Sequence, residues 1–443
     1  MSTTEQPPSG IRARRELTLE ELDSVVGGIS SAQASVSTHP LEKVAGFDPS
    51  HFHPDAAAMA SGQAEAQVAH AVQGGQLNTT QAMHLLETAA AADHTSVTQA
   101  LSMFAGHVIA AGPPPGELPG HDNHGGYADA VGGEIAQLIT SHQVTASQAM
   151  TDIGNAVTAH ALTGDQAMKV LEGVAHHGDA AVQAAVGTEI AALINAHQIT
   201  PGAAMMDIHG AVEAHNLTAL QAVNVLASVA GHGDVAMQQS VGAMIGDLTQ
   251  MHGSPKADDG LPLQPQIAIN VIDHAISSHI LTTDQALAVL VGIASSGNST
   301  TQTAVNAEIN HLVGHSAGAA DHALQTLASL PATGSTIWQH AIGGAMAAVM
   351  MNPRTFTMEV NLDHAINLVA GIAASRDVNG QLAIGGELGA AADALRGQDV
   401  ARAIADSDIL TRDQALMVLT GMTATGNSTT QAAVGRIIPN LEP

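Results

Sequence analysis

Histidine is the residue of this sequence with the widest capacity for chemistry, because the chain has 25 histidines and no cysteine. Two short groups stand out, "HFHPD" with His51 and His53 and "HDNH" with His121 and His124. Neutral imidazole is a good ligand for Zn, Ni and Cu(II). Neither group has the spacing of a zinc finger or of a helical H-E-x-x-H motif. We therefore expect weak, multi-site metal binding in these loops, no structural metal site and no other cofactor.

Other histidines recur at a fixed place in the sequence. His160, His215 and His279 each stand two residues before the same Leu-Thr pair. A residue that is copied whenever a unit is duplicated needs no function of its own to recur. Each of the three lies at the predicted end of a helix, where the helix dipole favours an imidazolium by about 0.3–1 kcal/mol. We interpret these histidines as structural.

The residues that could act as nucleophiles or general bases do not form a convincing catalytic group. The stretch "GHSAG" at 314–318 matches the G-x-S-x-G pattern of a nucleophile elbow, but that elbow needs a strand before it and a helix after it. Here the flanking residues, "AEINHLV" and "AADHAL", have helical patterns on both sides. Carboxylates are sparse and recur as helix caps. The sequence therefore predicts a non-enzymatic protein.

A unit that recurs along the chain must position all of these residues. Blocks that begin at His160, His215, His279 and Asp408 share the motif L-T-x-x-Q-A. Weaker copies near residues 75, 321 and 363 bring the total to about seven units, each of roughly 40–55 residues. Alternating strand patterns of any length are missing, so we predict an all-α helical repeat array, either a solenoid or small bundles in series.

The motif predicts how each helix of the unit begins and ends. Thr163 can cap a helix and Gln166, three residues later, can close a capping box. Gly173 interrupts the same helix at a cost of about 1 kcal/mol, which favours the close approach of a neighbouring helix. The helix then ends at "HHGD", where Gly178 is expected to be left-handed and Asp179 to cap the following helix.

Composition shifts divide the chain into seven segments. Two stretches rich in proline and glycine interrupt the repeats and read as linkers. The predicted organisation is a leader at 1–28, a poorly ordered linker at 29–60, repeat 1 at 61–111, a linker at 112–126, repeats 2–3 at 127–252, a linker at 253–266 and repeats 4–7 at 267–443.

The N-terminal stretch "RRELTLEELDSVVGGISS" (14–31) differs from the rest of the chain. Its apolar residues lie near one face of a short helix that ends in two glycines. This pattern resembles the double-glycine leader of bacteriocin-type peptides. The resemblance implies a peptidase-containing ABC exporter as partner, which would recognise Leu17, Glu21, Leu22 and Val25 and cleave after the pair Gly27 and Gly28.

The resemblance covers residues 1–28 only, and the body of the chain resembles no family known to us. The segment that follows is far larger than the peptides such leaders usually accompany. An ordinary short helix with a glycine C-cap is the alternative interpretation of the same residues.

Charge restricts the partners of the protein. Lys and Arg number 12 against 40 Asp and Glu, which gives a net charge of -28. Such a chain is repelled by nucleic acid and by anionic membrane surfaces, and aromatic residues make up only 1% of it. No stretch reaches the roughly 18 uncharged apolar residues of a membrane span, so we expect no membrane insertion. The lack of cysteine is compatible with export.

These observations predict an exported, non-enzymatic α-helical repeat protein that acts outside the cell as a binding or structural component with an unidentified extracellular partner. Three alternatives remain at this point. The protein could be a bacteriocin-like secreted toxin, a histidine-rich extracellular buffer of divalent metals, or a cytoplasmic scaffold whose leader-like start is coincidental.

Overall fold

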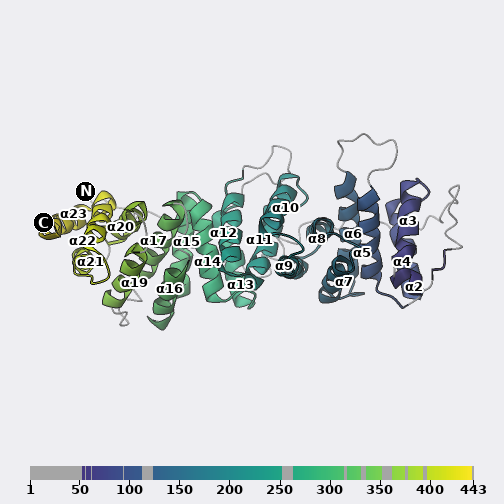
Figure 1. The fold of residues 1–443 in the computed structure, drawn as a ribbon, viewed down its shortest axis with the longest axis horizontal. Helices are drawn as coiled ribbons and strands as arrows, with labels where there is room; N and C mark the ends of the chain where they lie inside the picture. The colour runs from purple at the N-terminus through teal and green to yellow at the C-terminus, as the bar shows by residue number, and fades with distance from the viewer. Residues whose placement is uncertain are drawn as a thin grey trace, which may run out of the picture.

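The computed structural model describes residues 52–54, 56–60, 62–92, 94–111, 123–251, 263–313, 317–330, 336–351, 362–374, 378–392 and 397–441. All regular secondary structure in these ranges is α-helical. The helices stand side by side in one elongated row (Figure 1). The prediction of an all-α array is confirmed.

The helices follow one another along the row in chain order, so the sequence is laid out nearly linearly in space (Figure 1). The first half holds α2 (Ala56–Ala60), α3 (Gln63–Gln73), α4 (Thr79–Ala92), α5 (Val97–Ala111), α6 (Asn123–Thr140), α7 (Ala146–Thr158), α8 (Gly164–His177), α9 (Ala180–Asn195), α10 (Pro201–Glu213), α11 (Ala219–His232) and α12 (Val235–Leu248). The second half holds α13 (Pro265–Ser277), α14 (Thr283–Ser296), α15 (Ser299–Val313), α16 (Ala317–Ser329), α17 (Thr336–Met351), α19 (Leu362–Ala374), α20 (Val378–Ala392), α21 (Gly397–Ala405), α22 (Arg412–Thr425) and α23 (Ser428–Leu441). Among the described helices, extensive contacts join only elements close together in this order.

Helices extend into three of the segments that the sequence assigned to linkers. The short helix α2 lies inside 29–60, α6 begins at Asn123 inside 112–126, and α13 begins at Pro265 inside 253–266. Proline is favourable in the first turn of a helix because its missing N–H is unpaired there in any case. Pro265, one of the prolines that suggested a linker, therefore starts α13.

The threonine of the repeated motif is the N-cap of four helices, α8, α11, α14 and α22. In α8 the Thr163 hydroxyl accepts the Gln166 N–H at 3.2 Å, and the Gln166 side-chain oxygen accepts the Thr163 N–H at 2.8 Å. The same reciprocal pair starts the other three helices. The predicted capping boxes are confirmed.

The glutamine of each capping box also joins neighbouring units. The Gln221 amide of α11 donates to the carbonyl oxygen of His176 in α8 at 2.8 Å. The Gln285 amide of α14 donates in the same way to the Gly231 carbonyl of α11 at 2.9 Å. One side chain thus satisfies a donor at the start of its own helix and an acceptor near the end of another, both of which helix geometry leaves unpaired.

Replacing Gln285 with alanine should therefore weaken the array more than an ordinary surface change does. The variant loses both the capping bond to Thr282 and the bond to Gly231, and we expect about 1–3 kcal/mol of destabilisation. Urea denaturation followed by circular dichroism measures the change. The control is Gln67→Ala on the exposed surface of α3, which should stay within about 0.5 kcal/mol. Equal midpoints for the two variants would contradict the expectation.

Glycines allow helices of adjacent units to cross with their backbones in contact. A Cβ placed on Gly242 of α12 would press on the Val289 carbonyl and lie 2.8 Å from the Gly292 Cα of α14. A Cβ on Gly173 of α8 would lie 2.8 Å from the Asp129 Cα of α6. The expectation that the helix-interior glycines serve close approach is confirmed at these crossings.

The residues that terminate the helices differ from the expected ones. Gly178, which was predicted to be a left-handed cap, has an extended backbone instead, and so do its counterparts Gly233, Gly297 and Gly426. A Cβ on Gly178 would lie 2.6 Å from the Val182 Cβ, so this glycine makes room for the next helix. Among the described residues, the left-handed positions belong to Gly62, Gly75 and six histidines with φ between 56° and 61°: His94, His142, His160, His197, His215 and His279.

The core is built almost entirely from aliphatic side chains. Buried alanine, leucine, valine, isoleucine and methionine run from Met59 to Val434, with Phe104 as a fully buried aromatic ring. Small side chains let helices approach closely, which suits the glycine crossings.

None of the described helices is both long and apolar enough to cross a bilayer.

Candidate functional site

Most of the functional residues proposed from sequence lie outside the described residues. This holds for the leader residues Leu17, Glu21, Leu22, Val25, Gly27 and Gly28 and for His51 and His121. His53 is exposed, whereas His124 lies in the first turn of α6 and not in a loop as expected. The leader and metal binding by the two histidine groups therefore stay predictions, whereas the loop position of His124 was wrong.

A different histidine group converges where α6 crosses α8. The Asp129 carboxylate of α6 faces two consecutive residues at the end of α8, His176 and His177. The His176 Nδ1 lies 3.1 Å from Asp129 Oδ1, and the His177 Nε2 lies 3.4 Å from the same oxygen. The two imidazole rings are tilted against each other with centroids 4.4 Å apart. A ligand nitrogen from each ring and a carboxylate oxygen all lie within 4.8 Å of one another.

The electrostatics of this group favour the charged forms of Asp129 and His177. Burial disfavours ionisation of Asp129, but hydrogen bonds and charge from His176 and His177 outweigh it and hold the pKa of this carboxyl well below its usual range. The hydrogen bond to Asp129 raises the pKa of His177 above its ordinary value, against the opposing effect of burial. The cluster therefore places a carboxylate beside two histidine side chains at a half-exposed position.

A second feature, not predicted from the sequence, is a glutamate that recurs at equivalent places in α6, α9, α15 and α20: Glu134, Glu189, Glu308 and Glu387. Burial raises the pKa of Glu189 to about 7. Burial also raises the pKa of Glu308, and the charge of Asp273 adds to the effect. The recurrent sequences "GGEI", "GTEI", "AEI" and "GGEL" would have allowed these glutamates to be recognised from the sequence.

One of these recurrent glutamates, Glu134, forms a pair of carboxyl groups with a glutamate of another helix. Glu87 of α4 meets Glu134 of α6, and burial together with this second carboxyl raises the pKa of Glu87 to about 8. Two carboxylates in contact cannot both ionise easily, so one of them keeps its proton near neutrality. His84 lies 3.7 Å from Glu87 on the outer side of the pair. The pair ties the first helices of the row to α6 in a pH-dependent manner.

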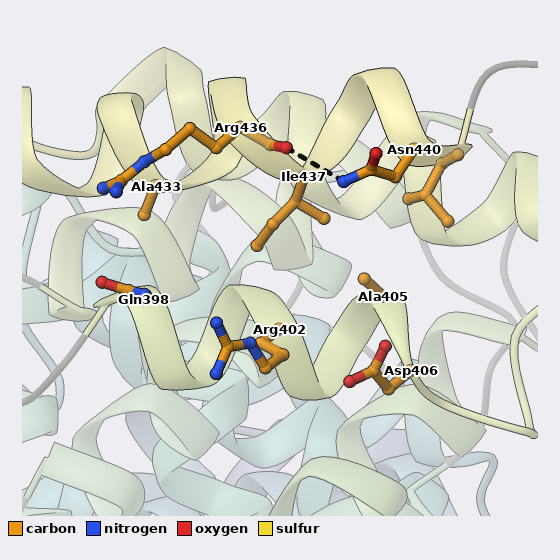
Figure 2. Close-up of a pocket in the computed structure, with 9 residues that line it drawn as sticks. Gln398, Arg402, Ala405, Asp406, Ala433, Arg436, Ile437 and Asn440 are labelled. Atoms are coloured by element: carbon orange, nitrogen blue, oxygen red, sulfur yellow. Dashed lines mark hydrogen bonds between the residues drawn. The ribbon is translucent and has the colours of Figure 1, made fainter.

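One hollow among the described residues lies between α21 and α23 and has a volume of about 370 Å³. Figure 2 shows Arg402 on α21 and Arg436 on α23, on facing sides of it. The Asp406 carboxylate and the Asn440 amide also line the pocket, and Asn440 donates to the Arg436 carbonyl at 3.2 Å. Two guanidinium groups at one pocket suit an anionic group, because each can donate a forked pair of hydrogen bonds to a carboxylate.

The described residues thus offer two chemistries, cation ligation between α6 and α8 and anion binding between α21 and α23. Neither site was predicted from the sequence, because the residues that form each site come from different helices. No protein-family model matches this chain, and no curated protein matches it.

Proposed function

We propose that the protein is an exported, non-enzymatic scaffold that holds a partner through the pocket between α21 and α23. The observation that carries the proposal is the pair Arg402 and Arg436 in a chain with only 12 basic residues against 40 acidic ones. The extended row of helices supplies the rigid support for such a site. Export rests on the leader-like residues 1–28.

The chemistry of the pocket favours a carboxylate over a phosphate. Arg402 and Arg436 bring two positive charges, but Asp406 removes one of them locally. A singly charged carboxylate matches this balance better than a doubly charged phosphate, and the net charge of -28 opposes nucleic acid. The partner therefore presents an isolated carboxylate on a peptide, because the same net charge also opposes a polyanionic segment.

Binding of a fluorescent peptide that carries a single glutamate tests the pocket. We expect the double variant Arg402→Ala/Arg436→Ala to bind at least about tenfold more weakly, a loss of about 1.4 kcal/mol or more. Asp406→Asn is the matched control with the opposite expected sign, because it removes the opposing carboxylate and should tighten binding. Unchanged anisotropy curves for both variants would rule out the pocket as the site.

Export has its own test. The intact mass of protein recovered from native culture medium should correspond to a chain that begins at Ile29, the residue after the glycine pair. Substituting Gly27 and Gly28 with valine should block the cut, because only a slim backbone fits the expected protease groove. Full-length protein found only in the cytosol would refute export while leaving the peptide-binding result intact.

A further inference from the structure

We propose that Asp129, His176 and His177 form a site for a divalent transition metal that joins α6 to α8. The three ligand atoms are an imidazole nitrogen from each histidine and one carboxylate oxygen, within 4.8 Å of one another. Two imidazoles and a carboxylate are a donor set that suits Zn²⁺, Ni²⁺ and Cu²⁺ and does not suit Mg²⁺ or Ca²⁺. The site is distinct from the pocket between α21 and α23.

Asp129 and His176 depart from the repeat together and meet His177, and this is the main argument for the site. In the crossing of α9 with α11 the corresponding residues are Ala184, Gly231 and His232. In the crossing of α12 with α14 they are Gln239, Ser295 and Ser296. Duplication of a unit explains a histidine that recurs, as with His160 and its copies. It does not explain the additional ligand-type residues Asp129 and His176, on two separate helices, that meet His177 at a single crossing.

The surrounding structure holds the ligands in place before any ion binds. The carbonyl of His176 accepts the Gln221 amide at 2.8 Å, which fixes the end of α8. Gly133 makes room for the His177 ring, since a Cβ there would lie 3.0 Å from the His177 Cδ2. The backbones of α6 and α8 are already in contact at Gly173. Little conformational entropy remains to be lost on metal binding, and such preorganisation increases affinity.

The exposure of the group leaves room for further ligands from solvent. The side chains of His176, His177 and Asp129 are 36%, 43% and 40% exposed. Bonds of about 2.0–2.2 Å to nitrogen and oxygen would draw the three groups slightly closer together around the ion. Zn²⁺ held by three protein ligands completes its tetrahedron with water.

Titration calorimetry of the full chain with zinc chloride at pH 7.5 tests the site. Because loop histidines are expected to bind weakly, the protein background is the variant His51→Ala/His53→Ala/His121→Ala/His124→Ala. In this background we expect one site whose affinity falls more than about tenfold in Asp129→Asn and in His177→Ala. The matched control is His232→Ala, at the equivalent place in α11, which should keep the site. Mg²⁺ should give no comparable heat.

Thermal unfolding supplies a second readout that is independent of the titration heat. Zn²⁺ should raise the melting temperature of the background protein, because an ion that binds only the folded state stabilises it. Zn²⁺ should not raise the melting temperature of Asp129→Asn. Circular dichroism of this variant without metal checks that it keeps its helical content and therefore folds. Equal affinity and equal thermal shift in Asp129→Asn and His232→Ala would overturn the proposal.

Discussion

Replacing Gly242 with alanine should destabilise the protein by about 1–3 kcal/mol, although alanine is the better helix former. The reason is steric. The new methyl group would press on the Val289 carbonyl and lie 2.8 Å from the Gly292 Cα, and both are backbone atoms of α14. A backbone cannot rotate away as a side chain can, so the two helices must separate and lose packing over the whole crossing.

The same substitution elsewhere should have the opposite sign. Gly210 lies in α10, and a Cβ there would meet nothing within 4 Å. Gly210→Ala should therefore stabilise the protein by roughly 0.5–1 kcal/mol through helix propensity alone. Urea denaturation of the two variants checks both expectations. The midpoint of Gly242→Ala should lie below that of the wild type, and the midpoint of Gly210→Ala above it. A Gly242→Ala protein as stable as Gly210→Ala would show that the crossing tolerates more space than its contacts indicate.

Acidification should stabilise the first part of the array through the pair of carboxyl groups at α4 and α6. Burial and the neighbouring Glu134 raise the pKa of Glu87 from 4.5 to about 8. A carboxyl whose pKa is raised by folding contributes stability that is complete below its unfolded pKa and is lost as the pH rises through its folded pKa. The window of loss therefore runs from about pH 4.5 to pH 8.

The variant Glu87→Gln isolates this contribution because glutamine keeps the shape but cannot titrate. It should match wild type near pH 5 and be more stable than wild type at pH 8.5. Its melting temperature should fall less steeply with rising pH, the free-energy slopes differing by at most about 1.4 kcal/mol per pH unit. Glu213→Gln, at an exposed position of α10, is the control and should preserve the wild-type slope. Identical slopes for Glu87→Gln and wild type would show that the pair does not hold its proton in the folded state.

Local features of the fold could be predicted from sequence because they depend on residues close together in the chain. The pair Thr163 and Gln166 lies within one turn and forms the expected capping box. Gly173 could be assigned to a helix crossing because a helix-interior glycine is unfavourable by itself and needs a tertiary reason. The crossing partner, α6, was not identifiable from that argument.

The errors and omissions arose where backbone conformation or distant contacts decide the outcome. Gly178 was expected to be left-handed, yet close packing against Val182 is what requires glycine there. Histidine occupies the left-handed position at other helix ends, and it is one of the few residues besides glycine that tolerate it. Asp129 and His177 are far apart in the chain, so only the crossing of α6 with α8 reveals that they meet.

The restriction of helix contacts to near neighbours has a mechanical consequence. Among the described helices, no extensive contact connects one end of the row directly to the other. A force applied to the two ends is therefore carried in series, unit after unit, and each unit bears the full load. We therefore expect such a protein to yield in discrete steps under tension and to re-form the lost helices once the load falls.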